Sequence, residues 1–174
     1  MNENYAQPDL PAGAEADVLR GCYRFSCFPT NALTTEVTLM GSGAILTEVI
    51  KAARLLETQG IATEVISVTS WSELARDGAN CERAELREGI GTIPFIAQQL
   101  GHGDGPVIAA TDYVRAVPES IRAYLPEGCA YLTLGTDGFG RSDTRAALRR
   151  HFGVDAESIA QAANFMLRRS ARPD

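Results

Sequence analysis

Hydrophobic residues recur along this chain with two different periods. Runs that are apolar on both faces, such as Val65, Ile66 and Val68, are typical of strands in a parallel sheet covered by helices. Longer segments repeat apolar residues every three or four positions, as between Ala44 and Thr58, where Gly60 ends the predicted helix. We expect strands at about 20–28, 36–40, 62–68, 106–110 and 130–134, and helices at about 44–58, 118–125, 143–152 and 155–167.

Two stretches have a weaker pattern. The segment that begins at Thr69 carries apolar residues at helical spacing, but Gly78 and Asn80 interrupt it, so we expect a break there and a second helical piece at 81–87. The segment 92–100 contains Pro94 and predicts a short helix or irregular packing.

Strand and helix alternate three times after the first strand. This order predicts an α/β domain with a mostly parallel sheet and helices on both faces. The first strand has no helical crossover, so it is expected to run antiparallel at the edge. Residues 1–18 are polar and rich in Pro, Ala and Gly, which predicts an extended N-terminal arm before a single domain at 19–174.

Composition narrows the class of protein. A chain of 174 residues fits one domain. The net charge of −6, with 16 basic against 22 acidic residues, argues against a nucleic-acid partner. No signal peptide or membrane-spanning run appears. The cysteines, which lack C-x-x-C spacing, suggest neither a metal site nor a disulfide framework, so we expect reduced thiols in a cytoplasmic protein.

The segment 131–145 joins the last strand to a helix through a loop with three glycines. Asp143 is a candidate N-cap for a helix that begins at Thr144. Since ligand sites in open α/β sheets lie at the carboxyl ends of strands, this loop is a candidate site. The alternative is a strand-to-helix turn that binds nothing.

Other candidate motifs have structural explanations. Gly41-Ser-Gly43 opens a helix as a dinucleotide fingerprint does, but Leu46 stands where a third small residue is needed, which favours a tight turn. Gly103-Asp-Gly105 resembles the start of a thiamine-diphosphate motif, yet no Asn follows at 126–133, which favours a flexible loop.

The isolated reactive side chains are weak catalytic candidates. His151 lies near a helix end, where a cation complements the dipole, and His102 lies between two glycines in a loop. Cys81 has no neighbouring His to act as a base. Asp112 and Asp137 end neighbouring predicted strands, where they form either a carboxylate pair or helix caps.

Three segments together resemble one enzyme family. They are 65–83 with its V-I-S-V-T-S-W-S-E-L-A-R-D-G-A-N-C-E-R sequence, I-P-F-I-A-Q at 93–98 with A-A-T-D-Y at 109–113, and L-G-T-D-G-F-G-R-S-D-T-R-A-A-L-R-R-H-F at 134–152. The chain resembles the C-terminal, transketolase-type domain of the homodimeric bacterial pyruvate dehydrogenases, the decarboxylating components of the pyruvate dehydrogenase complex.

The resemblance implies a three-layer α/β/α sandwich with a five-stranded mixed sheet and one antiparallel edge strand. It also implies that pyruvate is decarboxylated on thiamine diphosphate with magnesium, and that the two-carbon unit passes to a lipoyl acyltransferase. In this family the cofactor and the catalytic residues belong to the N-terminal and middle domains. We therefore carry over no catalytic, cofactor-binding or metal-binding residue, and expect the isolated chain to be inactive.

The family role of this domain is to complete the subunit and support the dimer. Our candidate for a domain or subunit contact is the loop formed by Asp137, Phe139, Gly140, Arg141, Ser142 and Asp143. Two alternatives stay open: a separate subunit of a split thiamine-dependent 2-oxoacid dehydrogenase, and a free-standing module that binds a small anion at the Gly41 or Gly135 loop. A domain that belongs to a larger enzyme should also expose apolar surface and self-associate weakly.

Overall fold

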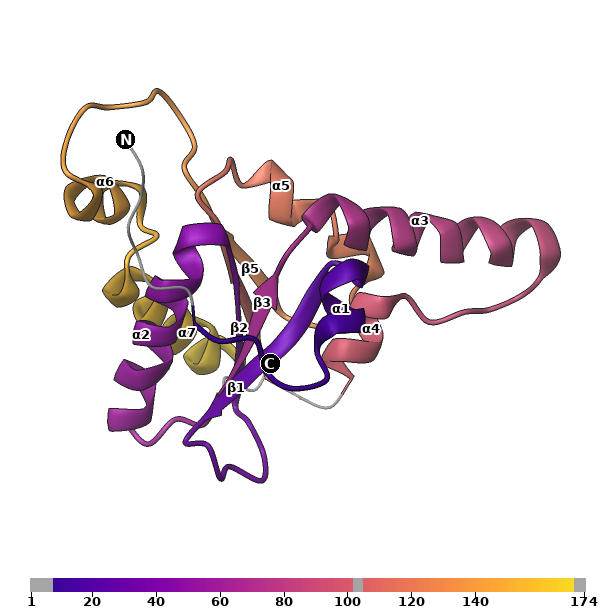
Figure 1. The fold of residues 1–174 in the computed structure, drawn as a ribbon, viewed down its shortest axis with the longest axis horizontal. Coiled ribbons are helices and arrows are strands. Elements are labelled where there is room, and N and C mark those ends of the chain that lie inside the picture. The colour runs from indigo at the N-terminus through magenta and orange to yellow at the C-terminus, as the bar shows by residue number, and fades with distance from the viewer. Residues whose placement is uncertain (1–7, 102–104, 171–174) are drawn as a thin grey trace.

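One five-stranded sheet organises the molecule (Figure 1). The computed structural model describes residues 8–101 and 105–170. The strands are β1 (Cys22–Phe28), β2 (Val37–Ser42), β3 (Thr63–Val68), β4 (Val107–Ala110) and β5 (Tyr131–Leu134), in the order β1-β3-β2-β4-β5. β1 pairs antiparallel with β3 at one edge, and the other pairs are parallel. This confirms the predicted mixed sheet and its antiparallel edge strand.

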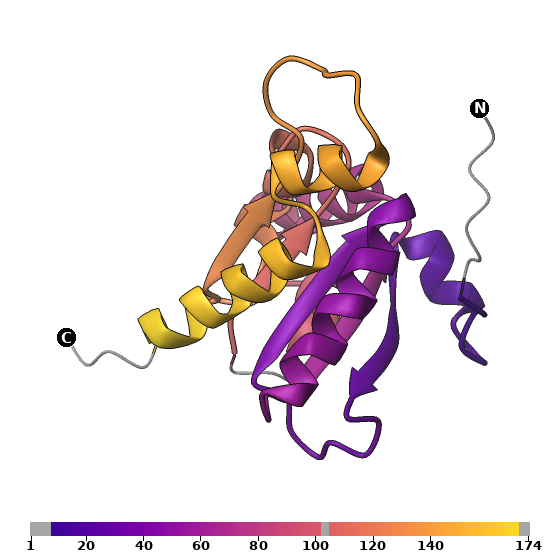
Figure 2. The same cartoon turned by 90° about the vertical axis from the view of Figure 1, so that its left-hand side faces the viewer.

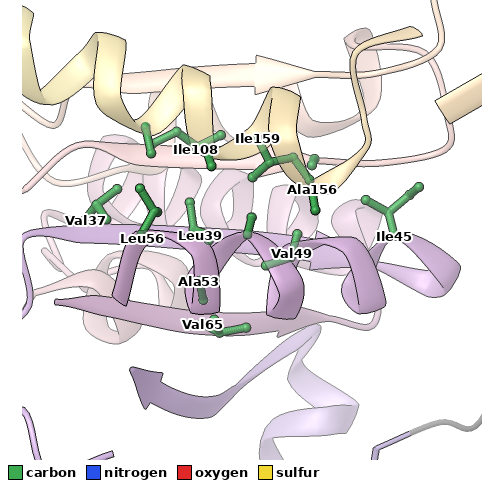
Figure 3. Packing of buried hydrophobic residues seen from close by; sticks show 14 of the residues in the cluster. Val37, Leu39, Ile45, Val49, Ala53, Leu56, Val65, Ile108, Ala156 and Ile159 are labelled. Atoms are coloured by element: carbon green, nitrogen blue, oxygen red, sulfur yellow. The ribbon is translucent and has the colours of Figure 1, made fainter. Parts of the chain in front are cut away.

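One face of the sheet is covered by two helices that pack on each other, α2 (Leu46–Thr58) and α7 (Ala156–Ser170). A short 3-10 turn, η1 (Gly43–Ile45), leads into α2. The buried stripe of α2 includes Val49, Ala53 and Leu56, as its period predicts (Figure 3). Ile159 of α7 packs against this stripe.

The opposite face carries α3 (Trp71–Glu88), α4 (Phe95–Leu100), α5 (Ala116–Glu119) and a second 3-10 turn, η2 (Arg122–Tyr124). Trp71, Leu74 and Phe95 pack there against Ile66 and other strand residues. Helices on both faces give the three-layer α/β/α sandwich that we expected (Figure 2). The remaining helices are α1 (Glu15–Arg20) and α6 (Arg145–Phe152).

Three local predictions were wrong. The N-terminal arm is not extended throughout, because Glu15–Arg20 is helical; residues 1–7 lie outside the described part. The helix after Thr69 does not break at Gly78 but runs unbroken over Trp71–Glu88. The helix predicted at 118–125 is two short pieces, α5 and η2.

The helix α3 extends well beyond the sheet (Figure 1). Its buried residues, Trp71, Leu74 and Gly78, all lie in its first half. Leu86 in its last turn, and Ile90 and Ile93 in the segment that returns to the domain, are 81%, 52% and 66% exposed. The distal part of α3 is therefore an arm with apolar side chains in water, and we call residues 79–93 the α3 arm.

Candidate functional site

The chain reverses its direction of winding between β2 and β4. β2 leads into α2 on one face of the sheet, whereas β4 leads into α5 on the other face. At this point the hydroxyl groups of Ser42 and Thr111 lie 2.8 Å apart, at the carboxyl ends of the two strands. Such a switch point opens a crevice outside the strand ends, which is where doubly wound folds bind ligands.

The Gly-rich loop after β5 is anchored beside this crevice. The Thr136 hydroxyl donates to the carbonyl oxygen of Asp112 at 2.8 Å, and the Arg115 N–H donates to Oδ1 of Asp137 at 2.8 Å. Gly135 packs so closely on the β4–α5 connection that a Cβ would stand 2.7 Å from the carbonyl oxygen of Tyr113. The base of the loop therefore has a defined position, while Phe139 near its tip is 95% exposed.

The helix that follows the loop begins one residue later than we predicted. The N-cap is Thr144, whose Oγ1 accepts from the Ala147 N–H at 3.3 Å. Asp143 instead accepts from the N–H of Thr144 itself, at 2.7 Å. Aspartate and threonine are both favourable N-cap residues, so the sequence alone did not show which of Asp143 and Thr144 caps the helix.

A cavity of about 330 Å³ lies between η1, this loop and α6. Gly140 and Arg141 line it from the loop, and Arg145 and Arg149 line it from α6. The rest of its wall is mostly apolar and consists of Ala44, Ile45, Asp112, Thr136, Leu148, Phe152 and Val154. Of the six loop residues predicted as a contact site, only Gly140 and Arg141 line this cavity; Ser142 and Asp143 are exposed.

A second cavity, of about 490 Å³, lies on the other side of Asp112. Hydroxyl groups dominate its wall, including Ser42, Thr69, Ser70 and Ser72. Trp71 also lines it, and its Nε1 is the single buried side-chain polar atom in the described ranges that has no hydrogen-bond partner.

The motif at the start of α2 forms a tight turn from strand to helix. A Cβ on Gly41 would stand 2.8 Å from Cγ2 of Val49 and 3.1 Å from Cα of Leu46. The close packing of α2 on β2 therefore accounts for a glycine at this position. Leu46 is buried in the first turn of the helix.

The structure shows no contact between the carboxylates of Asp112 and Asp137, which we considered as a pair. The Asp137 carboxylate is engaged by the N–H at the start of α5, as a cap would be. Asp112 lines both cavities. Of the other candidates, His151 is exposed and stacks edge-on against Phe152, and His102 and Asp104 lie outside the described residues.

The four cysteines are unpaired thiols. Burial, reinforced by Asp17, raises the pKa of the Cys22 thiol to about 12. Burial also raises the pKa of Cys27 and of Cys129. In the ranges that the structure describes, no three His, Cys, Asp or Glu side chains gather in a way that would hold a metal ion.

One ionic cluster was not found from the sequence. Glu119 on α5 accepts two hydrogen bonds from the Arg122 guanidinium, at 2.6 and 2.8 Å, and a third from the Thr133 hydroxyl. The bonds from Arg122 lower the pKa of the Glu119 carboxyl from its ordinary value of 4.5 to about 2. The i, i+3 spacing of Glu119 and Arg122 was the available signal, but the contribution of Thr133 depends on the fold.

Comparison with known proteins places this geometry in a family. The family model described as a transketolase-like C-terminal domain matches residues 21–155. The chain is 44% identical over 166 residues to the pyruvate dehydrogenase E1 component of Escherichia coli K12, and 46% identical to that of Cupriavidus necator. Each alignment covers 94% of this chain but 18% of the relative, so the chain spans less than a fifth of the relatives' length.

Solved transketolases share the fold. The enzyme from Leishmania mexicana superposes with a TM-score of 0.59 over 92% of this chain and 20% of its own, at 18% identity. A structure described as a split gene transketolase, an inactive β4 tetramer, superposes with a TM-score of 0.53 over 78% of this chain and 40% of its own, also at 18% identity. From the family match and the shared architecture, the chain belongs to the transketolase-like C-terminal domain family.

Proposed function

We propose that this chain acts as the C-terminal domain of a pyruvate dehydrogenase E1 component, with a structural role and no catalytic site of its own. The observation that carries the proposal is the alignment of 94% of the chain, at 44% identity, with less than a fifth of that enzyme. Such a match along nearly the whole domain supports a shared role in the same enzyme. In this proposal the domain completes an E1 subunit and supports its dimer.

The exposed apolar side chains are consistent with that role. Leu86, Ile90 and Ile93 on the α3 arm, and Phe139 on the loop after β5, are each more than half exposed. Large hydrophobic residues gathered on projecting segments are typical of surfaces that another domain or subunit covers. We propose that the α3 arm, together with the loop containing Asp137 and Phe139, contacts the remaining domains or the second subunit.

The cofactor of the complete enzyme is assigned elsewhere. Thiamine diphosphate would need a magnesium ion held by several oxygen ligands. The described residues contain no group of three His, Cys, Asp or Glu side chains that could hold a metal ion. We propose that thiamine diphosphate, magnesium and the decarboxylation chemistry belong to the rest of the enzyme. Transfer of the two-carbon unit to the lipoyl acyltransferase then takes place in the complete complex, in the cytoplasm. For its part, the chain has no helix in the described ranges with the length and apolar character to cross a membrane.

A chimaera tests the proposal. The segment of the Escherichia coli E1 component that aligns with this chain is replaced by this chain, and release of CO₂ from pyruvate is measured with thiamine diphosphate and magnesium. We expect the chimaera to be active, the enzyme without the segment to lose most of its activity, and the 174-residue chain alone to be inactive. Decarboxylation by the chain alone, or an inactive but folded chimaera, would contradict the proposal.

A second candidate is a separate subunit of a split enzyme. The similarity to a split gene transketolase favours it, because that enzyme is divided between genes. Mixing the separately purified chain with the truncated E1 component distinguishes the two. Activity that appears on mixing supports a separate subunit, whereas activity found only in the covalent chimaera supports a domain of one chain.

A further inference from the structure

We infer that the cavity between η1, the Gly-rich loop and α6 binds a small organic anion, with a carboxylate or phosphate head and an apolar body. The cavity lies beside the switch point between β2 and β4, with Ala44, which follows β2, and Asp112, which follows β4, in its wall. Its volume of about 330 Å³ is at the small end of the usual range for ligand pockets. The cavity shares the loop after β5 with the contact surface proposed above, and the titration below uses the 174-residue chain alone, so its outcome does not depend on that contact.

Charge is the first reason for this ligand class. Three arginines, Arg141, Arg145 and Arg149, line the cavity, and Asp112 is the carboxylate among its lining residues. Arg149 is also bonded to the buried Glu48. Guanidinium groups hold carboxylates and phosphates through paired, charge-assisted hydrogen bonds.

The position of Arg149 is set by a buried carboxylate. Its Nη1 lies 3.0 Å from Oε1 of Glu48, a residue that is 7% exposed. The same Oε1 accepts from Lys51 at 2.8 Å, while Oε2 accepts from the Ala156 N–H at 3.2 Å. Arg149 and Lys51 therefore share one carboxylate, and of these two cations Arg149 is the one that lines the cavity. A guanidinium held in this way loses little freedom when it binds an anion.

The wall of the cavity that faces α6 is formed by the loop after β5. The bonds from Thr136 to Asp112 and from Arg115 to Asp137 hold the base of the loop on the β4–α5 connection. The second half of the loop then brings Gly140 and Arg141 to the cavity, across from α6. Arg141 and Arg149 thus approach one space from two different segments, as a site for a single anionic group requires.

The apolar residues of the cavity wall indicate that the ligand has an apolar body beside its anionic head. Ile45, Leu148, Phe152 and Val154 line the cavity, and of these Leu148 and Phe152 are half-buried. An inorganic anion alone would leave these two side chains in contact with water. An apolar body on the anion would cover the wall and strengthen the ionic contacts by excluding solvent.

Calorimetric titration of the 174-residue chain tests the inference. The probes are phenyl phosphate and benzoate, which differ in the head group, with inorganic phosphate and phenol to supply the head or the body alone. We expect phenyl phosphate or benzoate to bind more tightly than inorganic phosphate and phenol. The stronger of the two identifies the preferred head group.

The variants locate the site. Arg141→Gln should weaken binding by about tenfold or more, as expected for loss of one charge-assisted hydrogen bond. The matched control Arg54→Gln removes an exposed arginine on α2, outside the cavity lining, and should leave binding unchanged. Amide shifts in NMR spectra on addition of the ligand should centre on Gly140 and Phe152. No saturable binding of any probe, or equal weakening by both substitutions, would overturn the inference.

Discussion

The ring of Tyr124 occupies the space in which a side chain on Gly78 would stand. A Cβ built on Gly78 would overlap Cγ of that ring, although the two residues lie in different elements, α3 and η2. The glycine therefore lets η2 pack against the middle of α3, and the helix continues through it. Glycine serves here for close approach and not as a helix breaker.

Gly78→Ala should destabilise the domain by about 1–2 kcal/mol. Overpacking against Tyr124 costs roughly 1–3 kcal/mol, which outweighs the gain of up to about 1 kcal/mol in helix propensity. Urea unfolding followed by circular dichroism measures the change. In a Tyr124→Ala background the same substitution should become stabilising, because the ring is gone. A Gly78→Ala variant that is stabilised with Tyr124 in place would refute the packing argument.

Removal of Arg149 should cost more stability than removal of its neighbour. Both arginines pair with a buried carboxylate, Arg149 with Glu48 at 3.0 Å and Arg150 with Asp155 at 3.5 Å, but the arginine side chains are 23% and 78% exposed, respectively. We expect Arg149→Met to lower the free energy of unfolding by about 1–3 kcal/mol, since Glu48 would keep Lys51 as its single cationic partner. Arg150→Met should cost less than about 1 kcal/mol. Equal losses in the two variants would show that the buried carboxylate does not depend on Arg149.

The Glu119 cluster predicts a loss of stability in acid. Bonds from Arg122 lower the pKa of the folded carboxyl to about 2 from an ordinary value of 4.5. A lowered pKa means that the ionised carboxylate stabilises the fold above pH 4.5, and that this contribution disappears as the pH falls from about 4.5 to about 2.

Glu119→Gln isolates this contribution because the amide does not titrate. The difference in free energy of unfolding between the wild type and the variant should be largest at neutral pH and should shrink through the acid range. Thermal unfolding at a series of pH values measures it. A difference that stays constant from neutral to acidic pH would rule out this linkage.

Thiol reactivity should follow burial. Cys22 is fully buried, and its pKa of about 12 leaves almost no thiolate near neutral pH. We expect iodoacetamide to leave Cys22 unmodified in the native chain and to modify it in urea, with mass spectrometry of peptides as the measurement. Cys81, which is half-buried on α3, is the internal comparison. Modification of Cys22 at the rate of Cys81 in the native state would contradict its burial.

The α3 arm should be dispensable for folding but needed for assembly. Leu86→Ser combined with Ile93→Ser replaces two side chains that are 81% and 66% exposed, so the stability of the isolated chain should change by less than about 1 kcal/mol. In the E1 chimaera the same pair should reduce dimer formation, measured by analytical ultracentrifugation. The control is Leu33→Ser, which changes a fully exposed leucine outside the arm. Reduced dimerisation by the control alone would place the contact elsewhere.

Periodicity along the chain was sufficient to predict the five strands and the burial of the sheet on both faces, and the missing crossover after the first strand predicted the antiparallel edge. Val65, Ile66 and Val68 place apolar side chains on both faces of β3, and α2 repeats its apolar residues every three or four positions. These patterns reflect which face of each element avoids water, and each element carries that information in its own residues.

The features that were missed depend on partners far away in sequence. Gly78 looked like a break because a glycine weakens an isolated helix, yet Tyr124 packs against it 46 positions later. Likewise, Arg149 in the wall of the cavity is bonded to Glu48, which lies 101 positions earlier in the chain. Close approach and buried ion pairs are properties of two surfaces in contact, so only the folded arrangement of the chain specifies them.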